Sequence, residues 1–269
     1  MRSTGLYWAV TRGSFRRFAT YRVATAAGIF TNTVFGFILS YTYIALWSQR
    51  PGLGGYDQSQ ALTFVWVGQA LLMALAIMGG GLEVELQSRI RSGDVAIDMY
   101  RPADLQTWWA AADAGRAGYH LLARGLLPMA AGALAFPLAL PLDPLRWAAF
   151  LLSTALAFLV SIAIRYMVGL TAFWLMDGAG INMAASLCSV FFSGMLLPLT
   201  VFPGSFGEAV RWLPWSSVLQ VPADVLLGRH TGAGLLAAFA FQAGWAVVLL
   251  LAGRAVQAAA TRKVVVQGG

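Results

Sequence analysis

Lysine and histidine are nearly absent from this chain. Among its 269 residues, Lys263 is the only lysine, and histidine occurs only as His120 and His230. A P-loop that binds a nucleotide needs a lysine after its second glycine, because this lysine contacts the terminal phosphates. Lys263 follows Thr261 and Arg262, so the sequence contains no such site. If ATP drives this protein, ATP and its Mg²⁺ bind to another polypeptide, and we expect no cofactor in this chain.

Few residues are available for metal binding or catalysis. Cys188 is the single cysteine, which excludes a disulfide within the chain. Neither histidine has a glutamate at helical spacing, so no metal site is expected. An intramembrane protease needs a base near its nucleophile at membrane depth. Ser193 and His120 are the remaining candidates for such an enzyme, and an activity lost on replacing them would support it.

Charged residues are scarce throughout the chain. Only 11% of the residues are charged and 59% are hydrophobic, whereas a soluble domain usually carries about 25% charged residues. So few charges could not cover a soluble surface of this size, and the composition therefore predicts a membrane protein. The formal net charge of +7 would suggest nucleic acid in a soluble protein. Here the arginines lie beside apolar runs, so we interpret them as orientation signals and expect no nucleic-acid partner.

Six apolar runs dominate the chain, and each is long enough to cross a bilayer as an α-helix. A spanning helix needs about 20 apolar residues. The runs lie within residues 23–47, 61–78, 121–140, 145–175, 181–201 and 234–252. We therefore predict an all-α integral membrane protein with six transmembrane helices in one domain, residues 23–269.

Residues 1–22 are basic and precede the first apolar run. Their apolar residues share one face of a helical wheel and arginines lie opposite, with Tyr7, Val10, Phe18 and Tyr21 against Arg2, Arg12 and Arg16. This pattern indicates an amphipathic helix that lies in the membrane interface. An irregular basic tail is the alternative.

The basic residues are distributed unequally between the two sides of the predicted membrane. The side that carries both termini has thirteen Lys and Arg residues, and the opposite side has four. Cytoplasmic loops carry the Lys and Arg excess. We therefore predict a multi-pass membrane protein with cytoplasmic N- and C-termini. The excess of arginine over lysine and the abundance of alanine and glycine indicate a bacterial source, so we expect the bacterial cell membrane.

Arg165 falls inside an apolar run. A helix that begins near Trp147 brings Arg165 about 27 Å into a hydrocarbon core that is about 30 Å thick. We interpret it as an anchor that snorkels to the inner headgroups; the alternative is a charge that faces a substrate path. No acidic residue falls clearly inside a run, which argues against an ion-coupled carrier. A secondary transporter or channel remains the alternative function.

Residues 82–118 form the longest polar stretch between runs. Apolar residues recur at every fourth position over residues 82–90, and Glu85 and Arg89 form an i,i+4 pair of favourable order. A second short helix follows, with Asp94 placed at its N-cap. Short helices with outward charges suit the docking of a cytoplasmic partner; a solvated loop helix is the alternative.

Residues 202–229 are too broken for a span and too apolar for a free loop. Non-helical backbone at membrane depth persists only where it is buried in protein or faces water. We expect short helices that dip into the outer leaflet and cap the exit of a path. Pro198, Pro203 and Pro214 mark the breaks between them.

Four motifs, in order along the chain, are similar to those of bacterial type-2 ABC-exporter permeases. Arg91-Ser92-Gly93-Asp94 and then Tyr100-Arg101-Pro102 resemble the Arg-Ser-Gly-Glu…Leu-Arg-Pro pattern of that family, although Asp94 stands where Glu is commoner. Phe173-Trp174 and residues 177–181 resemble its turn between the fourth and fifth spans. A third motif resembles the fifth span and outer helices of the family: Ser193-Gly194, Pro198, Phe202-Pro203, Leu213-Pro214-Trp215 and Pro222, with Trp215 in place of the commoner Phe. The fourth motif, residues 265–269, resembles the C-terminus of the family.

The resemblance implies the permease subunit of an ATP-driven exporter. Such a subunit pairs with a second permease, identical or related, above two ABC ATPase subunits. Residues 1–22 would be its connecting helix, with Arg12, Arg16 and Arg17, and residues 82–118 would contain its coupling helix. The implied coupling residues are Glu83, Glu85, Arg89, Arg91, Ser92, Asp94, Arg101 and Pro102.

The resemblance also implies that the second and fifth spans line the path between the two permeases. The aromatic residues of these spans are Phe64, Trp66, Phe191 and Phe192. They suit an amphiphilic drug, lipid or peptide as substrate, and they suit ordinary helix packing equally well.

Overall fold

The computed structural model describes residues 2–175 and 178–267, and within these residues it is helical with no strand. The α-helices are α1 (Arg2–Ala19), α2 (Arg22–Gln49), α3 (Gln58–Leu72), α4 (Leu82–Ser92), α5 (Val95–Tyr100), α6 (Leu105–His120), α7 (Leu126–Ala135), α8 (Pro144–Leu170), α9 (Ala179–Phe192), α10 (Gly204–Trp212), α11 (Gln220–Leu226) and α12 (Ala233–Gln267). The all-α fold class is therefore confirmed.

Three helices are long and apolar enough to cross a membrane by length and composition. They span Arg22–Gln49, Pro144–Phe173 and Ala233–Arg262. The other three predicted stretches are shorter or interrupted. The second stretch leaves the helix after Leu72, and the fifth has only the short apolar helix Ala179–Phe192.

The third predicted stretch begins earlier in the structure than the apolar run suggests. Helix α6 starts at Leu105 and continues through a π-helical segment, Leu121–Gly125, into α7. The polar first half of this rod was assigned from the sequence to the cytoplasmic segment, because its charges interrupt the hydropathy pattern. Asp113 and Arg116 are therefore buried side chains of a long helix.

The core lies where α2, α3 and α7 meet. Trp66 of α3 is fully buried there, with its indole between two glycines. A Cβ atom on Gly36 of α2 would lie 2.7 Å from the indole, and one on Gly132 of α7 would lie 2.2 Å from it. Both helices approach the ring closely only because these positions carry no side chain.

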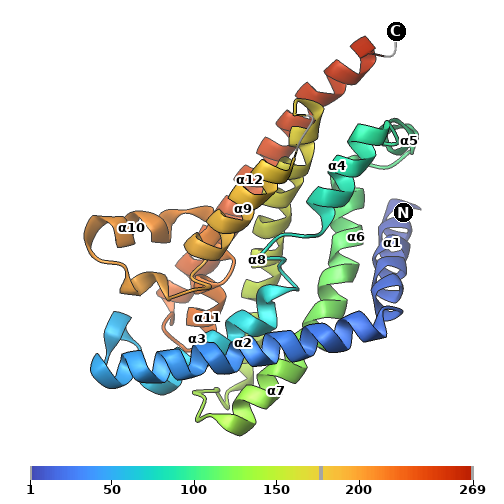
Figure 1. Ribbon diagram of the computed structural model, residues 1–269. Helices are drawn as coiled ribbons and strands as arrows, with labels where there is room; N and C mark the ends of the chain where they lie inside the picture. Colours follow the sequence, from blue (N-terminus) through green and yellow to red (C-terminus); the bar gives the residue numbers. More distant parts are fainter. Residues whose placement is uncertain (1, 176–177, 268–269) are drawn as a thin grey trace.

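Helix α1 packs along α6 (Figure 1). The Thr11 hydroxyl donates to the Ala111 carbonyl at 2.9 Å, and Gly115 leaves no space for a Cβ atom, which would lie 2.1 Å from the Thr11 carbonyl oxygen. The predicted amphipathic segment thus forms a helix, and one face of this helix packs against α6. Trp8 on this helix is exposed.

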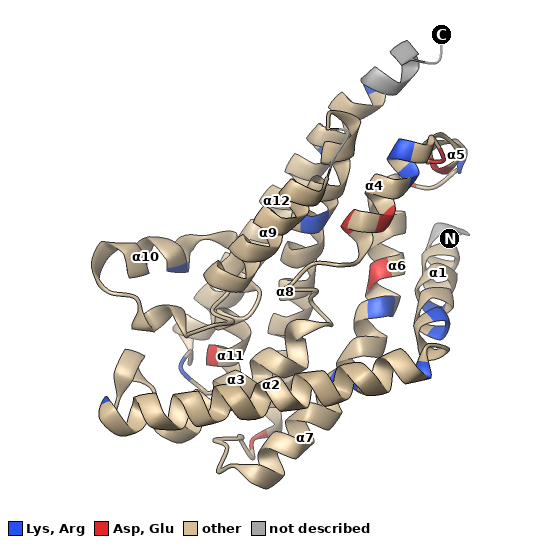
Figure 2. Ribbon diagram, viewed as in Figure 1, with Lys and Arg blue, Asp and Glu red and all other residues tan. Residues whose placement is uncertain are grey.

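The two ends of the molecule differ in character. Both termini lie at one end together with α4 and α5, and α10, α11 and the C-terminal end of α2 lie at the opposite end (Figure 1). Figure 2 shows that the charged residues lie mainly on α1, α4, α5 and α6, whereas α2 and α9 are nearly free of charge along their length. The end with both termini therefore carries most of the charge.

Candidate functional site

A short non-helical segment, residues 73–81, separates the apolar helix α3 from the charged helix α4. We call it the hinge segment. Three of its residues have positive φ: Ala76 at 47°, Gly79 at 71° and Gly80 at 84°. Positive φ is uncommon for a residue with a Cβ atom, so the surrounding structure must hold the backbone in this shape.

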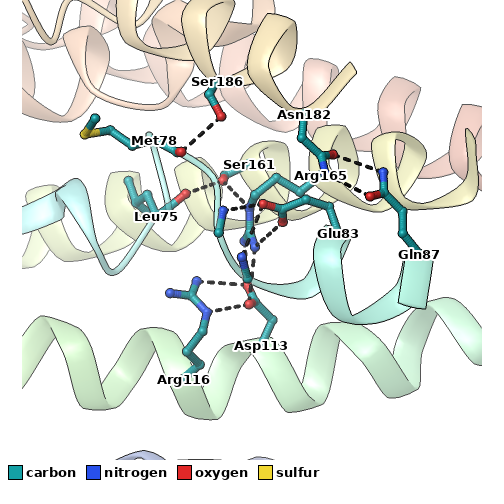
Figure 3. Close-up of polar contacts among 12 residues, drawn as sticks. Leu75, Met78, Glu83, Gln87, Asp113, Arg116, Ser161, Arg165, Asn182 and Ser186 are labelled. Atoms are coloured by element: carbon teal, nitrogen blue, oxygen red, sulfur yellow. Dashed lines mark hydrogen bonds and ion pairs between the residues drawn. The ribbon is translucent and has the colours of Figure 1, made fainter. Parts of the chain in front are cut away.

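Side chains from three other helices bind carbonyls of the hinge segment, and Figure 3 shows the two contacts made by Ser161 and Ser186. Arg116 of α6 donates to the Met73 carbonyl at 2.6 Å and to the Ala74 carbonyl at 3.0 Å. Ser161 of α8 donates to the Leu75 carbonyl, and Ser186 of α9 donates to the Met78 carbonyl at 3.0 Å. A buried carbonyl without a donor costs about 1–3 kcal/mol, so these contacts stabilise the break in the helix.

Glu83, near the start of α4, binds the other end of the hinge segment. Its Oε1 atom accepts hydrogen bonds from the Gly80 and Gly81 backbone N–H groups, at 2.5 Å and 3.2 Å. A carboxylate near a helix N-terminus is also favoured by the helix dipole. Glu83 therefore connects the start of α4 directly to the backbone of the hinge segment.

Glu83 belongs to a buried group of charges, which we call the four-charge cluster: Glu83, Asp113, Arg116 and Arg165. Asp113 lies between the two arginines and accepts from Arg116 Nε at 2.6 Å and from Arg165 Nη1 at 3.3 Å. Arg165 Nη1 is 3.8 Å from Glu83 Oε2. The four residues are 3–6% exposed, and their two positive and two negative charges balance.

The predicted role of Arg165 as a snorkelling anchor is wrong. Its guanidinium is buried and pairs with Asp113 and Glu83 (Figure 3), as a buried charge must be paired and hydrogen-bonded to offset its loss of solvation. Asp113 and Arg116 were not singled out from the sequence. Their i,i+3 spacing, together with one arginine inside an apolar run, was the signal that could have identified them.

A second ionic group fixes α5 against α4. Arg89 donates to both carboxylate oxygens of Asp98, at 2.5 Å and 2.9 Å, and Arg101 Nη1 lies 3.1 Å from the same carboxylate. The hydrogen bond to Asp98 raises the pKa of the Arg89 guanidinium above its ordinary value. The predicted Glu85–Arg89 pair is wrong, because Arg89 turns to the more deeply buried Asp98 instead.

Glu85 pairs across helices with Arg17 of α1. Arg17 Nη1 lies 3.5 Å from Glu85 Oε1, with both side chains at least half exposed. Such a pair contributes about 0–1 kcal/mol to stability, so it matters more as a link between α1 and α4 than as a source of stability. Arg12 and Arg16 of the predicted connecting helix are exposed.

The remaining predicted coupling residues lie around the turn between α4 and α5. Arg91 donates to the Gln87 carbonyl at 3.3 Å, and the Ser92 hydroxyl donates to Asp94 at 2.8 Å. Asp94 holds the predicted N-cap position of α5, but its side chain accepts no hydrogen bond from a backbone N–H there. Pro102 follows α5 in an exposed bend.

Helix α4 also contacts α9. Gln87 and Asn182 exchange two amide hydrogen bonds, at 3.0 Å and 2.8 Å. Gln87 donates in addition to the Val168 carbonyl of α8 at 3.2 Å. Helix α4 is therefore connected by polar contacts to α1, α8 and α9.

The aromatic residues predicted to line a path divide into two groups. Phe64 and Trp66 are buried in the core, so in this conformation neither faces an open path. Phe191 is exposed, and its ring lies 5.2 Å from that of Phe192, which is half-buried. Path lining stays a prediction for Phe191 and Phe192.

The prolines predicted to cap the exit lie at the breaks of the outer helices. Pro198 precedes a 3₁₀ turn, Pro203 precedes α10, and Pro214 begins a 3₁₀ turn before α11. Beside them Asp224 of α11 accepts hydrogen bonds from the Tyr56 hydroxyl and from the Gln220 amide. This buried contact ties the loop after α2 to α11.

The arrangement defines a class: a helical membrane protein in which a buried charged hinge joins an apolar helix to charged helices at one end. A family model described as ABC-2 family transporter protein matches residues 29–268. The chain belongs to this family, which confirms the resemblance in its motifs. It is therefore a membrane permease of an ABC transporter, not an enzyme by itself, and family membership implies association with ABC ATPase subunits. The comparisons with curated proteins and with solved structures give no match.

Proposed function

We propose that this chain is the permease subunit of an ATP-driven exporter in a bacterial cell membrane. In this proposal it crosses the membrane six times with both termini in the cytoplasm. It pairs with a second permease, identical or related, and two ATPase subunits that bind ATP and Mg²⁺ dock below α4 and α5. Phe191 and Phe192 suit an amphiphilic substrate such as a drug, lipid or peptide.

The contact of Glu83 with the hinge segment carries this proposal. Glu83 lies on α4 and holds the backbone N–H groups of Gly80 and Gly81. The same residue pairs with Arg165 of α8, which in turn pairs with Asp113 of α6. A push on α4 from a partner therefore reaches α3, α6 and α8 through fixed polar contacts.

The link between α1 and α4 gives the partner a second contact with the same unit. Arg17 and Glu85 pair across the two helices, and α1 is packed on α6. Packed interfaces tend to switch between discrete arrangements, since they deform little continuously. We therefore expect α1, α4 and the hinge segment to change position together between inward-open and outward-open states.

The test uses the single native cysteine. Cys188 lies on α9, to which α4 is connected through Gln87 and Asn182, so a fluorophore on Cys188 reports movement of α9. In the assembled complex, Mg²⁺-ATP with vanadate should change the fluorescence of the native protein. Glu85→Gln and Arg91→Gln should assemble and hydrolyse ATP but lose most of this change, because ATPase movement no longer reaches α4.

Glu208→Gln is the matched control, since Glu208 is an exposed carboxylate on α10 at the opposite end of the molecule. It should respond like the native protein. A normal response from both coupling variants would refute the coupling assignment. Flux driven by an ion gradient in liposomes without any ATPase would favour the secondary transporter or channel instead.

A further inference from the structure

A cavity of about 740 Å³ lies between α1, α4 and α6, at the end of the molecule that carries both termini. Its lining is strongly charged and has more positive than negative groups. Five arginines face three carboxylates, which are Arg17, Arg89, Arg101, Arg116 and Arg124 against Glu85, Asp98 and Asp113. The lining therefore has an excess of two positive charges and lacks anions to balance them.

Arg124 is an arginine of this cavity without an ion-pair partner among the described residues. Among the described residues no carboxylate pairs with it, and its Nε atom is buried without a hydrogen-bond acceptor. It lies in the π-helical segment Leu121–Gly125, and π-helical segments occur frequently at functional sites. Its guanidinium rests on Gly28 of α2, where a Cβ atom would lie 2.1 Å from Arg124 Cζ. The backbone of α2 at Gly28 therefore leaves space for this guanidinium.

One further buried polar group of the lining has no partner. His120 is 7% exposed and its Nδ1 atom makes no hydrogen bond. Buried polar groups are almost always hydrogen-bonded, because leaving them unpaired is costly. His120 lies about one helical turn before Arg124, so one bound acceptor group would satisfy both.

The position of the cavity relative to the apolar helices identifies the source of such a group. Phe18, Tyr21 and Ala24, at the corner between α1 and α2, line it beside Arg124. Tyr21 and its neighbour Val23 are exposed there, and aromatic residues favour the level of the lipid headgroups. An arginine fork matches the geometry of a phosphate, and anionic phosphate groups are abundant at the cytoplasmic surface of a membrane.

We propose that this cavity binds the phosphate headgroup of an anionic phospholipid from the inner leaflet. Arg124 supplies the charge, and His120 supplies a hydrogen bond. The site goes beyond export itself and rests only on the proposed orientation, with this end in the cytoplasm. Its test needs no ATPase, so failure here is distinct from failure of the coupling proposal.

The experiment is native mass spectrometry of the purified full chain titrated with phosphatidylglycerol, phosphatidylethanolamine or soluble glycerol 3-phosphate. The native protein should bind one phosphatidylglycerol at least about tenfold more tightly than phosphatidylethanolamine. Both phosphates are negatively charged, but the ammonium group of phosphatidylethanolamine makes its headgroup neutral overall. Arg124→Gln should lose about tenfold in affinity for phosphatidylglycerol. Gly28→Ala should also weaken binding, since its Cβ atom displaces the guanidinium while leaving its charge.

Arg22→Gln is the matched control, because Arg22 is an exposed arginine at the same corner that does not line the cavity. It should change the affinity less than about twofold. The site is refuted if Arg124→Gln and Gly28→Ala both bind phosphatidylglycerol as tightly as the native protein does. It is also refuted if the native protein binds phosphatidylglycerol and phosphatidylethanolamine with equal affinity. Equal affinity for glycerol 3-phosphate overturns the lipid as its source and leaves a soluble phosphate ester.

Discussion

Replacing Arg165 by methionine should destabilise the protein strongly. The substitution keeps an unbranched side chain of similar length in α8 but removes one positive charge from the four-charge cluster. Asp113 then keeps only Arg116, and Glu83 Oε2 loses the cation that lies 3.8 Å away. Breaking a buried ion pair by removing one partner costs about 3–5 kcal/mol, because the other charge stays buried without compensation.

The loss should appear as a lower melting temperature of the detergent-solubilised chain. For proteins somewhat smaller than this one, 1 kcal/mol shifts the melting temperature by roughly 2–4 °C. We therefore expect Arg165→Met to melt about 6–20 °C below the native protein. Arg146→Met, an exposed arginine on the same helix, serves as the control and should melt within a few degrees of the native protein.

A second substitution tests whether charge balance is the cause. Adding Glu83→Gln to Arg165→Met restores an equal number of positive and negative charges, and the double variant should lose less than the sum of the two single losses. Residues that share a network typically couple by about 0.5–3 kcal/mol. Additive losses, or an Arg165→Met variant as stable as Arg146→Met, would refute the account of the four-charge cluster.

Two further substitutions test the packing of the core and the buried polar contact of α11. Gly132→Leu should lower the melting temperature by several degrees, because a Cβ atom there would lie 2.2 Å from the Trp66 indole and overpacking costs about 1–3 kcal/mol; an unchanged melting curve would contradict this packing. Tyr56→Phe removes the hydroxyl that donates to Asp224. The buried carboxylate then has one hydrogen-bond donor fewer, which should lower the free energy of unfolding by about 1–3 kcal/mol. The same melting assay, with the exposed Tyr100→Phe as control, should show a loss only for Tyr56→Phe.

The sequence by itself determined the class of protein and the long apolar helices. Hydropathy is summed over neighbouring residues, so α2, α8 and α12 appear at the expected places. The amphipathic spacing of residues 1–22 likewise predicted a helix, and α1 spans Arg2–Ala19. The motifs at residues 91–102 and 193–222 were enough to indicate the family that the family model then matched.

The partners of the charged residues were decided only by the tertiary structure. Arg165 and Asp113 are separated by 52 positions in the chain, and neither position reveals the other in a single sequence. Glu85 and Arg89 have ideal helical spacing, yet each pairs with a residue of a different segment, Arg17 and Asp98 respectively. Local spacing shows which pairs are possible, but burial and distance select among them.

The hinge segment shows the same division. Residues 73–78 continue the apolar run, and every local signal there favours more helix until Gly79. The helix nevertheless ends after Leu72, because Arg116, Ser161 and Ser186 arrive from three other helices and bind the carbonyls that a break sets free. Composition and periodicity thus placed this chain in a membrane, whereas contacts between distant segments decided where its helix breaks.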